Sequence, residues 1–135
     1  MKQAPLLLIL LLFSCQRQPK SVGHNKIQVN DTVFLNFVLM HADGRKFDAS
    51  DHSDHQDKLR SNEPLRVIAG RNDVIKGFDE ALLSGLWIGD SAKVKLPPEK
   101  AFGNKGVPDI ILPGETILVH LEIVNVKKYY AQPYT

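Results

Sequence analysis

The stretch Val74-Ile75-Lys76-Gly77-Phe78-Asp79-Glu80-Ala81-Leu82-Leu83 decides the fold, because no other part of the chain has helical apolar spacing for more than one turn. Its apolar residues recur at three and four positions, as on one face of an amphipathic helix. Asn72 or Asp73 can cap the start of this helix, and Gly85 can end it. Gly77 costs the helix about 1 kcal/mol relative to alanine, which indicates either close backbone packing or mere tolerance.

On both sides of this segment the apolar residues alternate, which is the period of a β-strand. Residues 32–40 place Val33, Leu35, Phe37 and Leu39 on one face. Asp43-Gly44 then predicts a hairpin turn, since glycine adopts positive φ without steric cost, and residues 46–48 begin the return strand. Further strands are expected over residues 65–69, 91–96 and 116–127, with Lys93 and Lys95 facing water. One helix against one antiparallel sheet is an α+β domain.

Length and composition restrict the classes of protein. The chain has 135 residues, of which 43% are hydrophobic and 24% are charged, so we expect one compact domain. A net charge of +2 is too small for a surface that neutralises phosphates, and we expect no nucleic-acid partner. With Cys15 as its single cysteine, the chain can form neither an internal disulfide nor a four-cysteine zinc site.

The first fourteen residues have the layout of a signal peptide. Lys2 precedes an uncharged apolar run over residues 4–13, which is too short to span a bilayer. Leu12-Phe13-Ser14-Cys15 resembles the bacterial lipobox, which implies cleavage before Cys15 and its lipidation. Residues 15–29 would then be the lipidated cysteine and a flexible tether, and the protein would be extracytoplasmic, anchored on the periplasmic side or in the outer membrane. A plain secretory signal with an incidental cysteine is the alternative.

Five short motifs follow in order with regular spacing within residues 43–113: DGRKFD at 43–48, VIKGFDE at 74–80, GLWIGD at 85–90, LPPEKAFG at 96–103 and IILP at 110–113. This set resembles the FKBP-type peptidyl-prolyl isomerases. The resemblance implies a curved, five- or six-stranded antiparallel sheet wrapped around one short helix. It places the isomerase domain at residues 30–128 and leaves residues 129–135 as a tail.

The family's activity implies that the protein accelerates cis/trans exchange of X-Pro bonds while exported proteins fold, with proline-containing polypeptides as substrates. Rotation about the amide faces a barrier of about 18–20 kcal/mol, because resonance must be broken. A dry apolar pocket favours the twisted, less dipolar amide, so no nucleophile, metal or other cofactor is needed. We therefore expect no cofactor.

The resemblance also assigns the pocket. It implies catalytic roles for Phe47, Asp48, Ile75 and Phe102, and substrate contacts for Phe37, Leu65, Val74, Phe78, Ile111 and Val119. Phe78 would form the floor beneath the prolyl ring, and Asp48 would supply the polar wall. The backbone N–H of Ile75, at the helix start, would hold a substrate carbonyl. Taken without the resemblance, each phenylalanine also fits ordinary core packing, and so does Ile75.

The sequence departs from the family in its aromatic residues. Phe37 and Phe102 stand where tyrosine is usual, Phe78 replaces the usual tryptophan, and Leu65 and Val119 replace aromatics. We expect macrolides such as rapamycin to bind with weakened affinity, since one neutral hydrogen bond contributes about 0.5–1.5 kcal/mol. The competing interpretation is a catalytically weak FKBP-like chaperone or an envelope-complex binding module.

Two features remain outside this scheme. Residues 51–62 form an insertion in which His52 and His55 lie among aspartates, so a zinc or nickel site is an alternative to the solvated polar loop that we expect. Trp87 occupies a turn position that is usually charged in the family. It either packs over a neighbouring strand or marks a docking patch.

Overall fold

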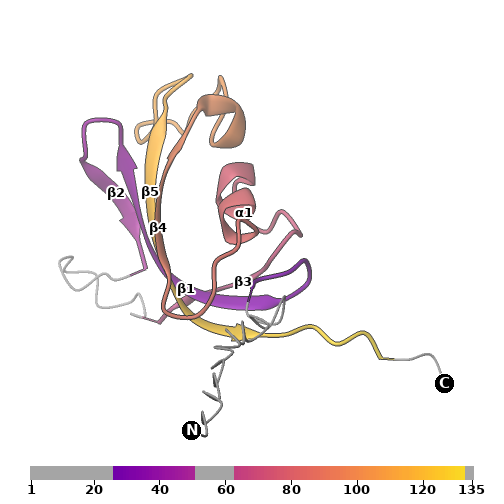
Figure 1. The fold of residues 1–135 in the computed structure, drawn as a ribbon. Coiled ribbons are helices and arrows are strands. Elements are labelled where there is room, and N and C mark those ends of the chain that lie inside the picture. Colours follow the sequence, from indigo (N-terminus) through magenta and orange to yellow (C-terminus); the bar gives the residue numbers. More distant parts are fainter. Residues whose placement is uncertain (1–25, 51–62, 133–135) are drawn as a thin grey trace, which may run out of the picture.

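The computed structural model describes residues 26–50 and 63–132. It contains one five-stranded antiparallel sheet whose inner face curves around a single short α-helix (Figure 1). The elements in chain order are β1 (Thr32–His41), β2 (Lys46–Ala49), β3 (Leu65–Ile68), α1 (Lys76–Leu82), β4 (Ser91–Leu96), the 3-10 helix η1 (Pro98–Lys100) and β5 (Ile117–Lys127). The predicted α+β class and its curved sheet around one helix are confirmed.

Strand β1 organises the sheet. Along one edge it pairs with β5 from Thr32 opposite Lys127 to His41 opposite Ile117. Its other edge is shared by two short strands at opposite ends, with β3 paired over residues 32–35 and β2 over residues 38–40. Asn36 and Phe37 therefore lie in the interval between β2 and β3.

The core fills the space between the inner face of the sheet and α1. Leu35, Leu82, Ile117, Ile123, Val33 and Val119 are the largest apolar side chains that are fully buried. Gly77 lies where the helix packs closely against β4, because a Cβ there would be 2.5 Å from the Leu96 Cδ2 atom. Close backbone packing, and not tolerance, therefore explains this glycine.

The helix is shorter than the sequence predicted. It begins at Lys76, and Ile75 occupies the N-cap position without a side-chain capping bond. The predicted caps are wrong, since Asn72 has φ 56° and the Asp73 carboxylate accepts the N–H of Ile68. The cause is the buried carboxylate of Asp79, which accepts the N–H groups of Gly70 and Asn72 at 2.7 and 3.1 Å and so binds this connection to the helix.

The strands match their predicted ranges to within one residue, and 91–96 agrees at both ends. Gly44 has φ 90° in the predicted hairpin turn, where its N–H donates to the carbonyl of His41. Lys93 and Lys95 are exposed, as predicted.

Within the described residues no helix has the length and apolarity that a membrane crossing requires. The predicted signal peptide, Cys15 and the insertion with His52 and His55 lie outside the described residues.

Candidate active site

Two aromatic pairs bring together four of the predicted site residues. The rings of Phe37 on β1 and Phe78 on α1 meet edge to face, with centroids 6.1 Å apart. Those of Phe47 on β2 and Phe102 after η1 meet in the same manner at 6.5 Å. Phe37, Phe47 and Phe102 are half-buried and pack against the core between sheet and helix. The four rings thus provide apolar surface from four separate segments.

A β-bulge sets the direction of Phe47. Leu39 pairs with Asp48, whereas the next residue, Met40, pairs with Lys46. Phe47 is the extra residue in this register, and a bulge of this kind redirects a side chain away from strict alternation. The centroid of its ring lies 5.0 Å from that of the His41 ring, and the same ring contacts Phe102.

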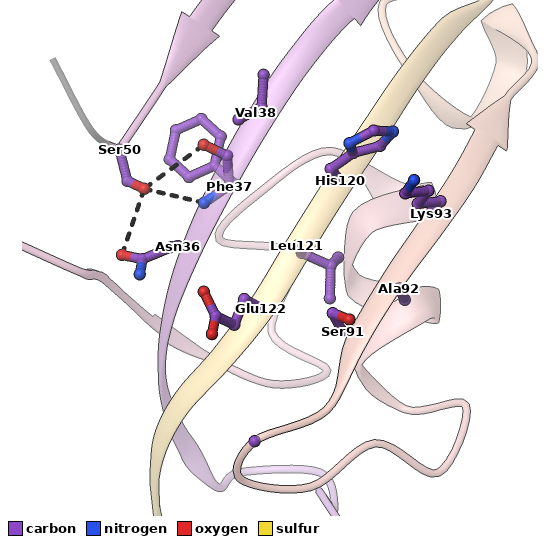
Figure 2. A pocket seen from close by; sticks show the side chains of 11 residues that line it. Asn36, Phe37, Val38, Ser50, Ser91, Ala92, Lys93, His120, Leu121 and Glu122 are labelled. Atoms are coloured by element: carbon purple, nitrogen blue, oxygen red, sulfur yellow. Dashed lines mark hydrogen bonds between the residues drawn. The ribbon is translucent and has the colours of Figure 1, made fainter. Parts of the chain in front are cut away.

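Ser50 fixes the backbone of Phe37 where β1 has no edge partner. Its Oγ accepts the Phe37 N–H at 2.9 Å, and its own N–H donates to the Phe37 carbonyl at 3.0 Å. Figure 2 shows the Ser50 hydroxyl between Phe37 and Asn36. Because Ser50 is buried, these bonds are shielded from water and keep Phe37 in place.

Ile75 presents a backbone donor at the start of α1. Its carbonyl accepts the N–H groups of Phe78 and Asp79, at 3.0 and 3.2 Å. Within the described part of the chain, its own N–H donates to no acceptor. Val74 and Ile75 are both half-buried and pack against the core. The geometry therefore fits the predicted capture of a substrate carbonyl by this N–H.

Asp48 is half-buried on β2, opposite Leu39. Directly opposite residues of an antiparallel pair share a face of the sheet, so the carboxylate lies on the same side as the buried Leu39. Its Oδ1 accepts the N–H of Ala49 at 2.9 Å.

The remaining predicted contacts differ in exposure. Leu65 is half-buried at the start of β3, whereas Phe78 and Ile111 are almost completely buried, with exposed fractions of 3% and 4%. Val119 is completely buried and offers no surface to a ligand in this conformation. It is a core residue here, and its predicted contact with substrate stays a prediction.

Sequence reasoning missed the pair formed by His41 and Glu115. The Nδ1 atom of His41 lies 2.5 Å from Oε1 of Glu115, and Oε2 of Glu115 accepts the N–H of Leu112 at 2.8 Å. These contacts tie the β1–β2 hairpin to the loop that carries Ile111. No local signal could have revealed the pair, since 74 positions separate its members.

Residues 26–50 and 63–132 contain no group of three or more histidine, cysteine, aspartate or glutamate side chains that could hold a metal ion. His41 is engaged with Glu115, and His120 belongs to the outer face of the sheet (Figure 2). The prediction for His52 and His55 is untested, because both lie outside these ranges.

Two hollows border single residues of the predicted site. A cavity of about 450 Å³ borders Ile111, between the β1–β2 hairpin and the loop over residues 105–115. A larger one, of about 700 Å³, lies over the outer face of the sheet, where Asn36, Val38, Ser91, Lys93, His120 and Glu122 project (Figure 2). The larger hollow shares only Phe37 with the predicted site. We place the candidate site at the aromatic pairs, since those side chains and the Ile75 N–H can hold an apolar ring and a carbonyl.

Comparison with known proteins identifies relatives of this chain. FK506-binding protein 1A of Neurospora crassa is 34% identical over 110 residues, which cover 82% of this chain and 84% of that protein. The human peptidyl-prolyl cis-trans isomerase FKBP2 is 30% identical over 111 residues, covering 81% of this chain and 72% of that protein. FK506-binding protein 2 of Yarrowia lipolytica is 29% identical over 101 residues, which cover 75% and 64% of the two chains.

Residues 23–124 match the family described as FKBP-type peptidyl-prolyl cis-trans isomerase. This range contains both aromatic pairs, the helix start at Ile75 and the His41–Glu115 pair. The family predicted from the five motifs is confirmed. The chain belongs to the FKBP-type peptidyl-prolyl cis-trans isomerases.

Proposed function

We propose that this protein is a lipid-anchored, extracytoplasmic prolyl isomerase that accelerates X-Pro exchange in exported polypeptides as they fold. The observation that carries the isomerase role is the presence of two edge-to-face pairs, Phe37–Phe78 and Phe47–Phe102, together with a helix start whose Ile75 N–H has no acceptor among the described residues. The lipobox-like sequence before Cys15 supports the anchor and the location.

In the proposed mechanism no covalent bond is made or broken, and the only change is rotation about the X-Pro amide bond. The prolyl ring enters the apolar surface between the aromatic pairs, where the twisted amide is favoured because it is less dipolar than the planar form. The Ile75 N–H holds a carbonyl of the substrate, so that one part of the chain is fixed while the other rotates. Asp48 supplies the polar wall of the pocket.

Macrolide binding extends the proposal to a ligand class. The relatives from Neurospora crassa and Yarrowia lipolytica are named for binding FK506. Phenylalanine at positions 37 and 102 offers no hydroxyl to such a ligand. Loss of one neutral hydrogen bond weakens binding by about 2- to 12-fold, so we expect rapamycin to inhibit with reduced affinity.

A client-binding role with weak catalysis is the second candidate. It is favoured by the exposure of Ile110 and Leu112, at 51% and 73%, on the loop that also carries Ile111. Apolar side chains at the rim of a site can hold unfolded chain whether or not a proline is turned.

A proline-containing tetrapeptide assay distinguishes the two. The isomerase proposal predicts faster cis/trans exchange with added protein, and a decrease of this acceleration with rapamycin. If exchange keeps its spontaneous rate while an unfolded client protein still binds, the protein is a binding module. Mass spectrometry of the protein extracted from bacterial membranes tests the anchor, since lipidation adds the mass of the acyl chains to a product that begins at Cys15.

A further inference from the structure

The single tryptophan of the protein and two of its three tyrosines gather at one end of the domain. Trp87 follows α1 and is half-buried, and the next residue, Ile88, is 43% exposed. Tyr129 and Tyr130 follow β5 and are 56% and 77% exposed. Together with Lys26 and Lys128, these four residues form what we call the aromatic end face.

Specific contacts join its three chain segments. Lys128 Nζ lies 5.8 Å from the centroid of the Trp87 ring and donates to the carbonyl of Lys26 at 3.1 Å. The N–H of Ile27 donates to the carbonyl of Leu86 at 2.9 Å, which binds the first described residues to the Trp87 turn. The aromatic end face is therefore built into the fold.

A buried carboxylate completes these contacts. Asp31 is 1% exposed, and it accepts the ammonium of Lys128 at 2.5 Å and the N–H of Tyr129 at 2.8 Å. These bonds hold the start of the tail against the domain. Trp87 thus packs on the core beside Lys128, yet the next residue, Ile88, remains exposed.

The face lies at the far end of the sheet from the candidate active site. Thr32, at the start of β1, pairs with Lys127, whereas His41, at its other end, lies beside Phe47. The two ends of β1 are nine residue steps apart, which corresponds to about 30 Å of extended chain. Figure 1 shows the end of β5 at the bottom and the β1–β2 hairpin at the top.

The composition of the face suits a phospholipid surface. Tryptophan and tyrosine prefer the membrane–water boundary, because each has an apolar ring and a polar tip. Lysines at the same level extend their ammonium groups to anionic headgroups. Lys26 of this face is an exposed cation, and so is Lys127 beside it at the end of β5. Asp31 pairs with Lys128, and the exposed carboxylate of Asp90, which accepts the N–H of Trp87, offsets one of the two exposed cations. The local charge favours an anionic surface.

We propose that the aromatic end face docks on the anionic phospholipid surface in which the protein is anchored, an inference that rests on the lipid anchor at Cys15 proposed above. Eleven residues lead from Cys15 to Lys26, and the tether that the sequence predicts there would have a root-mean-square reach of about 18 Å. The anchor therefore holds this end of the domain, and not the end with Phe47, against the bilayer. Docking therefore turns the candidate active site away from the bilayer, and exported chains can reach the site from that side.

The fluorescence of Trp87 reports docking directly, because the protein has no other tryptophan. The full-length lipidated protein is reconstituted into phosphatidylglycerol and phosphatidylcholine vesicles whose acyl chains are brominated or unmodified. We expect brominated vesicles to quench Trp87. The double substitution Ile88→Ser, Tyr130→Ser should reduce this quenching. The matched substitution Ile110→Ser, Leu112→Ser removes apolar surface at the other end and should leave it unchanged.

The outcomes separate this inference from the anchor. Protein that sediments with vesicles but keeps its full Trp87 emission would overturn docking while the anchor stands. Failure to sediment, with unquenched Trp87, would overturn both. An emission shift that follows protein concentration without lipid would assign the face to a second copy of the chain and also overturn docking. Tetrapeptide isomerisation, measured on the same samples, tests catalysis independently.

Discussion

The imidazole Nδ1 of His41 lies 2.5 Å from the Glu115 carboxylate, and both side chains are only 14% exposed. His41 ends β1 and contacts the ring of Phe47, whereas Glu115 lies just before β5 and accepts the N–H of Leu112. The pair therefore connects one aromatic wall of the candidate site to the loop that carries Ile111.

Replacement of this carboxylate tests whether the pair positions the site. In Glu115→Gln the charge is lost and the contact with His41 weakens, so Phe47 and the loop should be held less firmly. We expect the KM for a proline-containing tetrapeptide to rise several-fold, with a smaller change in kcat. Asp109→Asn removes the same charge from an exposed position in the same loop and serves as control. Unchanged KM in Glu115→Gln would remove the positioning role.

Acid should weaken the fold through two carboxylates. Hydrogen bonds from His41 and then from the Leu112 N–H lower the pKa of Glu115. Burial acts to raise the pKa of Asp31, but hydrogen bonds from Lys128, Tyr129 and Gln28 outweigh burial and lower it. Since both pKa values are below their ordinary values of 4.5 and 3.8, the unfolded chain binds more protons in acid. Their stabilisation is fully present above those values and is lost as pH falls through the folded pKa values.

Urea unfolding between pH 7 and pH 3 measures this loss. Asp31→Asn should lower the free energy of unfolding at pH 7 by about 1.5–3 kcal/mol, the contribution of a hydrogen bond to a charged group. It should also flatten the decline below pH 4, because one titrating group has been removed. The control Asp109→Asn should leave the free energy of unfolding at pH 7 and its decline below pH 4 unchanged. A decline in Asp31→Asn as steep as in the parent would contradict the assignment.

Gly77→Ala should destabilise the protein, although alanine is ordinarily the better helix former. The added methyl would lie 2.5 Å from Leu96 Cδ2 and 3.0 Å from the carbonyl oxygen of Lys100. Overpacking of this kind costs about 1–3 kcal/mol, which over most of that range exceeds the gain of about 1 kcal/mol in helix propensity. Thermal unfolding measures the change. Leu96→Val shortens the obstructing side chain, so Gly77→Ala should cost less in that background; equal costs would locate the strain elsewhere.

Phe102→Tyr should restore a hydroxyl to the candidate site. If the hydroxyl reaches the ligand, rapamycin should bind about 2- to 12-fold more tightly, as expected for one added hydrogen bond. Tetrapeptide isomerisation should change much less, because the proposed catalysis depends on the apolar surface. Titration calorimetry and the peptide assay on the same preparation provide the comparison. Tighter binding in Phe34→Tyr, a change on β1 outside the predicted pocket, would show that the effect is not local.

Most of the fold could be predicted from local patterns. Alternation of apolar residues predicted four strands, because a strand with one buried face must place its apolar side chains at every second position, and the Asp43-Gly44 turn predicted the fifth. The helix start could not be predicted in this way. Asn72 and Asp73 have the right chemistry for caps, but the buried Asp79 holds the backbone N–H groups of Gly70 and Asn72 and fixes a different conformation.

The prediction of the candidate site depended on the family resemblance, whereas the packing of its residues could be seen only in the folded chain. The motifs predicted which residues to examine, yet none of them indicates that Phe37 meets Phe78 or that Phe47 meets Phe102. Ser50, which holds the backbone of Phe37, gave no signal at all. A bulge in the pairing of β2 with β1 decides the direction of Phe47, and no spacing rule anticipates it.

By itself, the sequence determined the α+β class, the family and the approximate limits of every strand, because these follow from periods and motifs along a continuous stretch. Only the tertiary structure decided that Gly77 is needed for close packing, that His41 pairs with Glu115 and that Trp87 shares one end of the domain with Tyr129. Each of these contacts joins residues far apart in the chain. Their proximity depends on the register and curvature of the whole sheet, which no local pattern encodes.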